Sequence, residues 1–349
     1  MKRNFKPFFQ SNIFLPVIVV ILGFLTATLL ILVVGKNPGA MYSAIVQVIS
    51  GFDLRSNSFN PRYIGEWFVM SMPLILCGLS MGFAARTGLF NIGAEGQYIA
   101  GLTAAQYMAV LGPQIPILHW IMTLLAAITA GAIWGGLVGW FKAQFNVSEV
   151  VATIMMNYIA LFGSRIVTLS ISGTNSYHTP DFPKTALLRS PILEYITNGS
   201  RINHGLWFTL AAVIFFWVMM EKTRFGYSLR ATGFNKDAAR YGGINIKSTL
   251  TISMAIAGAF AGLAGAIVAL GSFNYGRVLA GQDGYGFDGI AVALVGNCRA
   301  WGTALSGLFF GMLKSAQPLM QSRQIPREIT GIIIGLAVVF ISFKKKDGQ

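Results

Sequence analysis

The sequence has few charged residues, cysteines and histidines. Asp, Glu, Lys and Arg make up 11% of its 349 residues, whereas soluble domains carry about 25%. The two cysteines, Cys77 and Cys298, lie in apolar stretches without metal-ligand spacing, so we expect both to pack in the core. The three histidines, His119, His178 and His204, are widely separated. This composition excludes an ordinary soluble domain and argues against a metal or catalytic cluster.

The sequence also lacks the common catalytic motifs. It contains no GxxxxGK[ST] phosphate loop, no HExxH zinc pair and no GxSxG nucleophile elbow. A multi-spanning membrane enzyme would need a catalytic constellation, and none is visible. We therefore expect a chain that is not an enzyme, binds no cofactor or metal, and hydrolyses no nucleotide itself.

Long apolar runs dominate what is present. Hydrophobic residues make up 54% of the chain, and the mean hydropathy is +0.62. A membrane-spanning helix needs about 20 mainly apolar residues, and this criterion predicts an all-α, polytopic helix bundle that forms one transmembrane domain over residues 1–349. The ten predicted spans are 14–34, 64–84, 89–110, 117–141, 150–170, 206–220, 250–271, 285–298, 301–318 and 325–343.

The net charge of +14 comes from basic residues at the ends of these runs. Basic residues of this kind set the orientation of membrane proteins, and with ten spans they place both termini in the cytoplasm. The basic patch with interleaved aromatics that nucleic-acid binding requires is missing. The first apolar run is longer than a signal-peptide core, so we expect it to be retained as a span.

One polar segment, Glu221–Lys247, holds six Lys or Arg residues between two apolar runs. Within it, Asn235 is placed to cap a short helix, Asp237 lies in the first turn, and Arg240 lies near the end. Gly242 is placed to close the helix in the left-handed conformation. A capped helix on a polar loop indicates a cytoplasmic docking surface.

Two predicted spans are interrupted in similar ways, at 86–101 and 281–297. Each places glycines and a carboxylate, Glu95 or Asp288, near membrane depth, and paired interrupted spans point to a transport path. The alternative is that each carboxylate pairs with a donor at a helix end. A polar stripe that includes Asn157 and a group of aromatics near the interruptions could contact substrate, or could serve interhelical hydrogen bonding and the interface belt. The candidate path residues are Asn91, Glu95, Gln97, Asn157, Phe273 and Asp288.

Glycines recur four residues apart in several predicted spans. The pairs include Gly131 with Gly135, Gly258 with Gly262, and Gly331 with Gly335. Such spacing lets helices approach closely in lipid, so we expect these glycines to pack helix against helix.

Four segments in this order resemble one family: GLFNIGAEGQYIAG, SEVVATIMMNYIA, TRFGYSLRATGFNKDAARYGGI and GFDGIAVALVGN. Over residues 64–343 the chain resembles the permease subunits of bacterial ABC importers, in the branch shared by branched-chain amino acid, ribose-type sugar and nucleoside systems. It looks most like the nucleoside or simple-sugar permeases.

The resemblance implies a multi-pass permease in the bacterial inner membrane that moves nucleosides or simple sugars inward by alternating access. Its expected partners are a second permease subunit, identical or related, two cytoplasmic ATPase subunits that bind ATP and Mg, and an extracytoplasmic solute-binding protein. The segment 221–247 would hold the coupling helix. The residues that match the family's docking pattern are Gly233, Asn235, Ala238, Ala239, Gly242 and Gly243.

A second hypothesis remains open from the residues alone. An ion-coupled secondary transporter could use Glu95 and Asp288 as ion sites, because ionisable groups inside a membrane are costly and often functional. That hypothesis leaves the polar segment 221–247 without a role.

Overall fold

The computed structural model describes residues 14–54, 56–326, 328, 329, 331–333 and 335. The helices are α1 (Phe14–Val33), α2 (Gly39–Ser50), α3 (Arg62–Arg86), α4 (Ala94–Leu111), α5 (Leu118–Phe145), α6 (Glu149–Leu169), α7 (Pro191–Ile196), α8 (Gly205–Lys222), α9 (Arg224–Phe234), α10 (Lys236–Tyr241), α11 (Ile246–Ser272), α12 (Tyr285–Val295) and α13 (Ala300–Ser322). The strands are β1 (Phe52–Asp53), β2 (Ser58–Phe59), β3 (His178–Asp181) and β4 (Tyr275–Arg277). The fold is therefore mainly helical.

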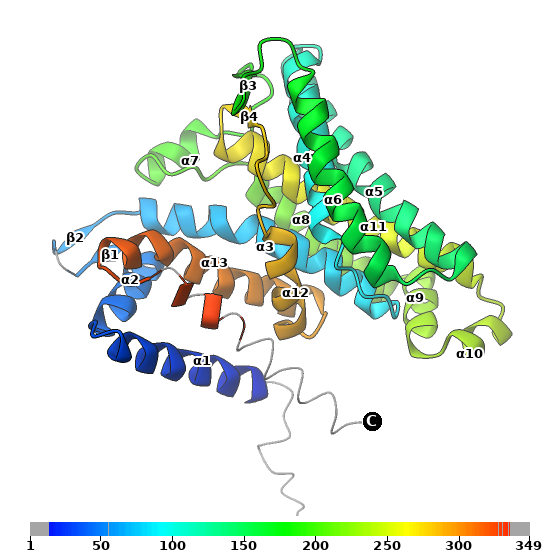
Figure 1. The fold of residues 1–349 in the computed structure, drawn as a ribbon, viewed down its shortest axis with the longest axis horizontal. Helices are drawn as coiled ribbons and strands as arrows, with labels where there is room; N and C mark the ends of the chain where they lie inside the picture. Colours follow the sequence, from blue (N-terminus) through cyan, green and yellow to red (C-terminus); the bar gives the residue numbers. More distant parts are fainter. Residues whose placement is uncertain (1–13, 55, 327, 330, 334, 336–349) are drawn as a thin grey trace, which may run out of the picture.

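The long helices form a bundle with two distinct ends. In Figure 1, α4, α5, α6 and α11 run together between the β3–β4 sheet at the top and α9 with α10 at the lower right. We call these the β3–β4 end and the α10 end. Helices α3, α12 and α13 pack together and connect to the first group through α3 with α11. Among the described residues, five helices are long and apolar enough to cross a membrane: α3, α5, α6, α8 and α11.

Helices occupy the first nine predicted spans, with shifted boundaries at the two interruptions. Residues 87–93 are irregular, and α4 begins only at Ala94. Helix α12 has 11 residues and is about 17 Å long, which is too short to cross a hydrocarbon core of about 30 Å. The predicted span 325–343 lies mostly outside the described residues, and the count of ten spans stays a prediction.

Glycines bring α5 and α11 into backbone contact, as the sequence predicts. A Cβ atom added to Gly131 would lie 2.3 Å from the carbonyl oxygen of Gly258, and one added to Gly262 would lie 2.4 Å from the carbonyl oxygen of Ala127. Only glycine allows this separation. No described atom lies within 4 Å of a Cβ added at Gly331 or Gly335, and for this pair, at the edge of the described residues, helix packing stays a prediction.

The connections at the β3–β4 end are structured. Strands β3 and β4 pair antiparallel, and α7 lies between β3 and α8, with the Ser190 hydroxyl accepting from the Leu193 N–H. Arg201 in the same connection donates to the Glu66 carboxylate of α3 at 2.6 Å, and these hydrogen bonds raise the pKa of Arg201. The connection before α8 is therefore tied to the bundle.

The segment before α3 forms more than a surface helix. Helix α2 buries Met41, Ala44 and Val48 completely. These side chains belong to one buried hydrophobic cluster with Phe310 and its neighbours on α13. The physical reason is that Met41, Ala44, Ile45 and Val48 are spaced to form one stripe of α2, which the bundle covers.

Candidate functional site

The segment 221–247 folds into α9 and α10, and the predicted cap is present. The Asn235 side-chain oxygen accepts from the backbone N–H groups of Asp237 and Ala238, each at 3.0 Å. Asp237 lies in the first turn of α10 and Arg240 in the last. The prediction for Gly242 was wrong: its φ is −75°, and Gly243 takes the left-handed conformation, with φ +80°.

One face of α10 is buried and the other is open. Ala239 is 5% exposed and packs with Ala84, Leu89 and Ile246, whereas Asp237, Ala238 and Arg240 are exposed. An exposed, capped helix anchored by one alanine on the bundle can present a firm surface to another protein.

A backbone contact connects this segment to the interruption before α4. A Cβ added to Gly233, near the end of α9, would lie 2.4 Å from the carbonyl oxygen of Arg86. Gly88, with φ +75°, faces Gly233 from the other side of the contact. No side chain fits between these backbones, so α9 and residues 86–88 are in direct contact.

The interruption itself is held by a buried amide pair. The Asn91 amide donates to the Gln97 side-chain oxygen at 2.9 Å, and the Gln97 amide donates to the Asn91 oxygen at 3.1 Å. Ser80 of α3 accepts from Asn91 and donates to Gln97. All three side chains are at most 1% exposed, so their hydrogen bonds define the conformation of residues 91–97.

Asn157 of α6 stabilises the same segment from the other side. Its side-chain oxygen accepts from the Gly96 N–H at 2.8 Å, and its amide donates to the Ile92 carbonyl at 3.1 Å. Asn157 is 2% exposed. The structure thus brings three of the predicted path residues, Asn91, Gln97 and Asn157, to one polar segment whose hydrogen bonds are made within the protein.

Glu95 joins the two interrupted segments. Its carboxylate accepts from the backbone N–H groups of Gly284 and Gly286, at 2.7 and 2.6 Å, and the side chain is completely buried. Gly286 is needed here because a Cβ on it would lie 2.2 Å from the Glu95 nitrogen. The carboxylate therefore caps the start of α12, where the helix dipole favours negative charge.

Asp288 pairs with Lys314 of α13, a residue that the sequence reasoning left out. The Lys314 ammonium also lies 5.1 Å from the centre of the Tyr285 ring. Lys314 sits in an apolar run, 26 positions beyond Asp288, so no local pattern marks the pair. An ionisable residue within a predicted span was the available signal.

Phe273 lies in a second charged group near the β3–β4 end. The Arg277 guanidinium lies 4.7 Å from its ring centre and forms a two-point ion pair with Asp283. The buried Tyr98 hydroxyl donates to Asp283 at 2.8 Å. Residues of this group, with Tyr275 of β4, line an open cavity of about 450 Å³.

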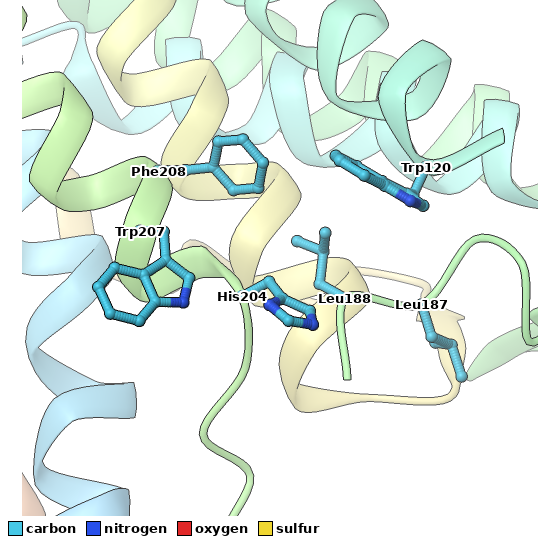
Figure 2. A pocket seen from close by; sticks show the side chains of 6 residues that line it. All are labelled: Trp120, Leu187, Leu188, His204, Trp207 and Phe208. Carbon is cyan, nitrogen blue, oxygen red and sulfur yellow. The ribbon is translucent and has the colours of Figure 1, made fainter. Parts of the chain in front are cut away.

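A separate cavity at the start of α8 carries none of the predicted site residues. Figure 2 shows it between α5, α8 and the connection before α8, and its volume is about 210 Å³. The rings of Trp120 and Phe208 lie 5.8 Å apart, and His204 is the one titratable residue in the lining. The lining is mainly apolar, and its polar side-chain groups are the His204 ring and the indole N–H groups of Trp120 and Trp207.

The predicted residues therefore form four groups. The predicted coupling residues lie at the α10 end. Asn91, Glu95, Gln97 and Asn157 lie where α3, α4, α6 and α12 meet, and Asp288 and Phe273 lie in the adjoining charged groups. Among the described residues, no group of three or more His, Cys, Asp or Glu side chains could hold a metal ion.

Comparisons with known proteins identify the family of the chain. Residues 63–342 match the family model described as branched-chain amino acid transport system / permease component. The chain is 39% identical to the guanosine ABC transporter permease protein NupP of Bacillus subtilis, over 95% of this chain and 93% of the relative. It is 34% identical to the nucleoside ABC transporter permease protein NupB of Lactococcus lactis, over 95% and 91% of the two chains.

A sugar permease is also among the relatives. The glucose ABC transporter permease protein TsgB13 of Haloferax volcanii is 32% identical, over 79% of this chain and 75% of its own length. The similarity to both nucleoside and sugar permeases thus extends over most of the bundle.

Proposed function

The chain belongs to the family of branched-chain amino acid transport system permease components, and on that premise we propose that it carries nucleosides into the cell as the membrane-spanning subunit of an ABC importer. The observation that carries the nucleoside proposal is the similarity to NupP, a guanosine permease by name, over nearly the full length of both chains. The relation to NupB, a nucleoside permease by name, supports it. The glucose permease matches a smaller part of the chain at lower identity.

The geometry of the two carboxylates gives no support to ion coupling. Glu95 uses both oxygens to accept backbone N–H groups, and Asp288 is neutralised by Lys314. Both carboxylates thus already have partners that account for their burial in the bundle. We therefore retain the ATP-driven importer, which also accounts for the segment 221–247.

The exposed face of α10 is the proposed docking surface for the ATPase subunits, which would bind ATP and Mg. The coupling residues are Gly233, Asn235, Asp237, Ala238, Ala239, Arg240, Gly242 and Gly243. This assignment puts the α10 end and both termini in the cytoplasm, with ten spans in the inner membrane. The solute-binding protein would approach the β3–β4 end, and a second permease, identical or related, would complete the core.

The proposed transmission runs through the glycine contact. Movement of α9 and α10 would be passed through Gly233 to Gly88 and then to residues 91–97. Glu95 would carry it to α12 through its two hydrogen bonds. Switching this connected unit between two arrangements would open the path to one side at a time, as alternating access requires.

Reconstitution tests the substrate. We would place the chain in proteoliposomes with its partner ATPase, second permease and solute-binding protein, and measure uptake of radiolabelled guanosine, uridine, ribose and glucose. We expect ATP-dependent uptake of the nucleosides and none by the chain alone. Uptake of glucose in preference to guanosine would contradict the nucleoside assignment, and gradient-driven uptake without the ATPase would contradict the importer.

Reversing the charge at the start of α10 tests the docking surface. Asp237→Arg places a positive charge in the first turn, where the helix dipole disfavours it by about 0.3–1 kcal/mol, and changes the face offered to the ATPase. We expect membrane insertion to persist while ATPase co-purification and uptake are lost. We expect the same outcome for Gly243→Trp. Asp237→Asn, which removes the charge without reversing it, is the matched control and should retain most uptake. Normal uptake in both Asp237→Arg and Gly243→Trp would contradict docking here.

A further inference from the structure

A cavity of about 700 Å³ lies at the α10 end, between α8 and the start of α13. Its lining includes Arg86 at the end of α3, Trp217 and Glu221 on α8, and Arg299 and Trp301 at the start of α13. The position is the end of a membrane-spanning helix, since α8 is one of the five candidate spans. The cavity is separate from the predicted path residues.

The charge in this cavity is positive and only partly compensated. Glu221 is the one carboxylate in the lining, and it contacts both Arg86 at 2.8 Å and Arg230 at 3.5 Å. Within the part of the chain that the structure describes, no acidic side chain pairs with Arg299, which is exposed. Lys222 adds a further cation, 5.3 Å from the centre of the Trp217 ring. An anion would find uncompensated charge here.

The two tryptophans in the lining are exposed, as is typical of tryptophan in the headgroup region of a membrane. Trp217 is 37% exposed and Trp301 is 48% exposed. For the described residues, neither indole N–H donates to a protein acceptor, so both remain available to a ligand oxygen. Tryptophan is enriched where a membrane protein crosses the headgroup region, because one end of its ring is polar and the rest apolar.

Apolar stripes continue from the cavity along both helices. On α8, Leu210 and Ile214 share a face with Trp217 and are each 43% exposed. On α13, Leu305 follows Trp301 by four residues and is 68% exposed. Because α8 ends at the cavity and α13 begins there, both stripes run from the charged mouth toward the middle of the bundle.

From this combination we propose that the cavity binds the phosphate headgroup of an anionic, two-chain phospholipid such as phosphatidylglycerol. Arg299 and the two indole N–H groups bind the phosphate, and the acyl chains lie on the stripes of α8 and α13. Basic pockets between membrane helices recognise lipid headgroups in this way. The uncompensated charge excludes a preference for zwitterionic lipid. The apolar stripes favour a lipid over an acidic segment of the ATPase, because such a segment would have no apolar chains to place on them.

Native mass spectrometry of the full chain in detergent tests the proposal, with added phosphatidylglycerol or phosphatidylcholine as probes. We expect phosphatidylglycerol to be retained preferentially. Arg299→Gln should reduce that retention about fivefold, the effect of roughly one basic residue at a membrane surface, and Arg299→Lys should preserve most of it. Arg224→Gln is the matched control, because Arg224 is an exposed arginine of α9 outside the lining.

Several outcomes would overturn the proposal. Equal retention in the original chain and Arg299→Gln would show that Arg299 binds no lipid, and an equal loss in Arg224→Gln would show a general surface-charge effect. Displacement by inorganic phosphate or by soluble glycerophosphoglycerol would show that the acyl stripes take no part. If Arg299→Gln keeps its lipid but loses ATPase co-purification, the cavity belongs to the ATPase interface. Thermal unfolding of each variant checks that the fold is intact.

Discussion

At the scale of single residues, the buried polar groups around residues 91–97 are satisfied by specific partners. Glu95 and Asn157 hold backbone N–H groups, and Asn91 and Gln97 hold each other. A buried polar group without a partner costs free energy, so such pairing is expected in any folded protein. The four residues therefore stabilise the fold through these hydrogen bonds, whether or not they also line the path.

Glu95→Gln tests that function. A Gln amide offers one acceptor and one donor where the carboxylate offers two acceptors, so one of the Gly284 and Gly286 N–H groups loses its partner. We expect the free energy of unfolding to fall by about 1–3 kcal/mol and α12 to loosen at its start. Thermal unfolding in detergent measures this.

The control for Glu95→Gln is Glu194→Gln on α7, because Glu194 is exposed. We expect it to leave the unfolding temperature unchanged. Unchanged unfolding in Glu95→Gln would contradict the capping function, and a loss confined to ion-driven uptake would support ion coupling instead.

The sequence did not predict Lys314 as the partner of Asp288. Its partner Asp288 lies on another helix, and neither residue is near the other in the sequence. A search for apolar runs treats a single lysine as an exception within a span, although an ionisable residue at that position is itself a signal of pairing or function.

At the scale of elements, capping residues predicted that a short helix forms, but not the residue at which it ends. Asn235, Asp237 and Arg240 specify α10 through contacts within four residues, so the short helix is readable from the sequence. The closing glycine was misplaced by one position, because both Gly242 and Gly243 can adopt the left-handed conformation. In the structure it is Gly243 that does so.

The contact between α5 and α11 predicts the effect of one added methyl group. In Gly131→Ala the Cβ would meet the Gly258 carbonyl oxygen at 2.3 Å, so the helices must separate. We expect a loss of about 1–3 kcal/mol in the free energy of unfolding, the usual cost of overpacking, measured by thermal unfolding in detergent.

Gly136→Ala on the same helix is the matched control. Its Cβ would meet the Ala255 side chain at 3.4 Å, an ordinary contact. We expect it to be neutral or slightly stabilising, because Ala has the higher helix propensity. Equal behaviour of the two variants would contradict the close packing.

At the scale of the whole molecule, the proposed transmission depends on Gly233. In Gly233→Ala the Cβ would lie 2.4 Å from the Arg86 carbonyl oxygen, which displaces α9 from residues 86–88. We expect uptake to fall at least tenfold while the ATPase still co-purifies, because the docking face of α10 is unchanged. Uptake and co-purification in the reconstituted importer measure the two effects separately.

Gly163→Ala on α6 is the control for this variant, since no described atom lies within 4 Å of a Cβ added there and a helical backbone suits alanine. We expect nearly normal uptake. Normal uptake in Gly233→Ala would contradict transmission through this contact.

The sequence by itself determined that this chain is a helical membrane protein, that α10 is capped and exposed, and that glycines pack helices together. These properties depend on composition, on hydrophobic runs and on residues within one or two turns of each other. Only the tertiary structure decided that Glu95 caps α12, that Lys314 neutralises Asp288, and that Gly233 touches residues 86–88. Each of these contacts joins segments distant in the sequence, and their partners are chosen by how the helices pack.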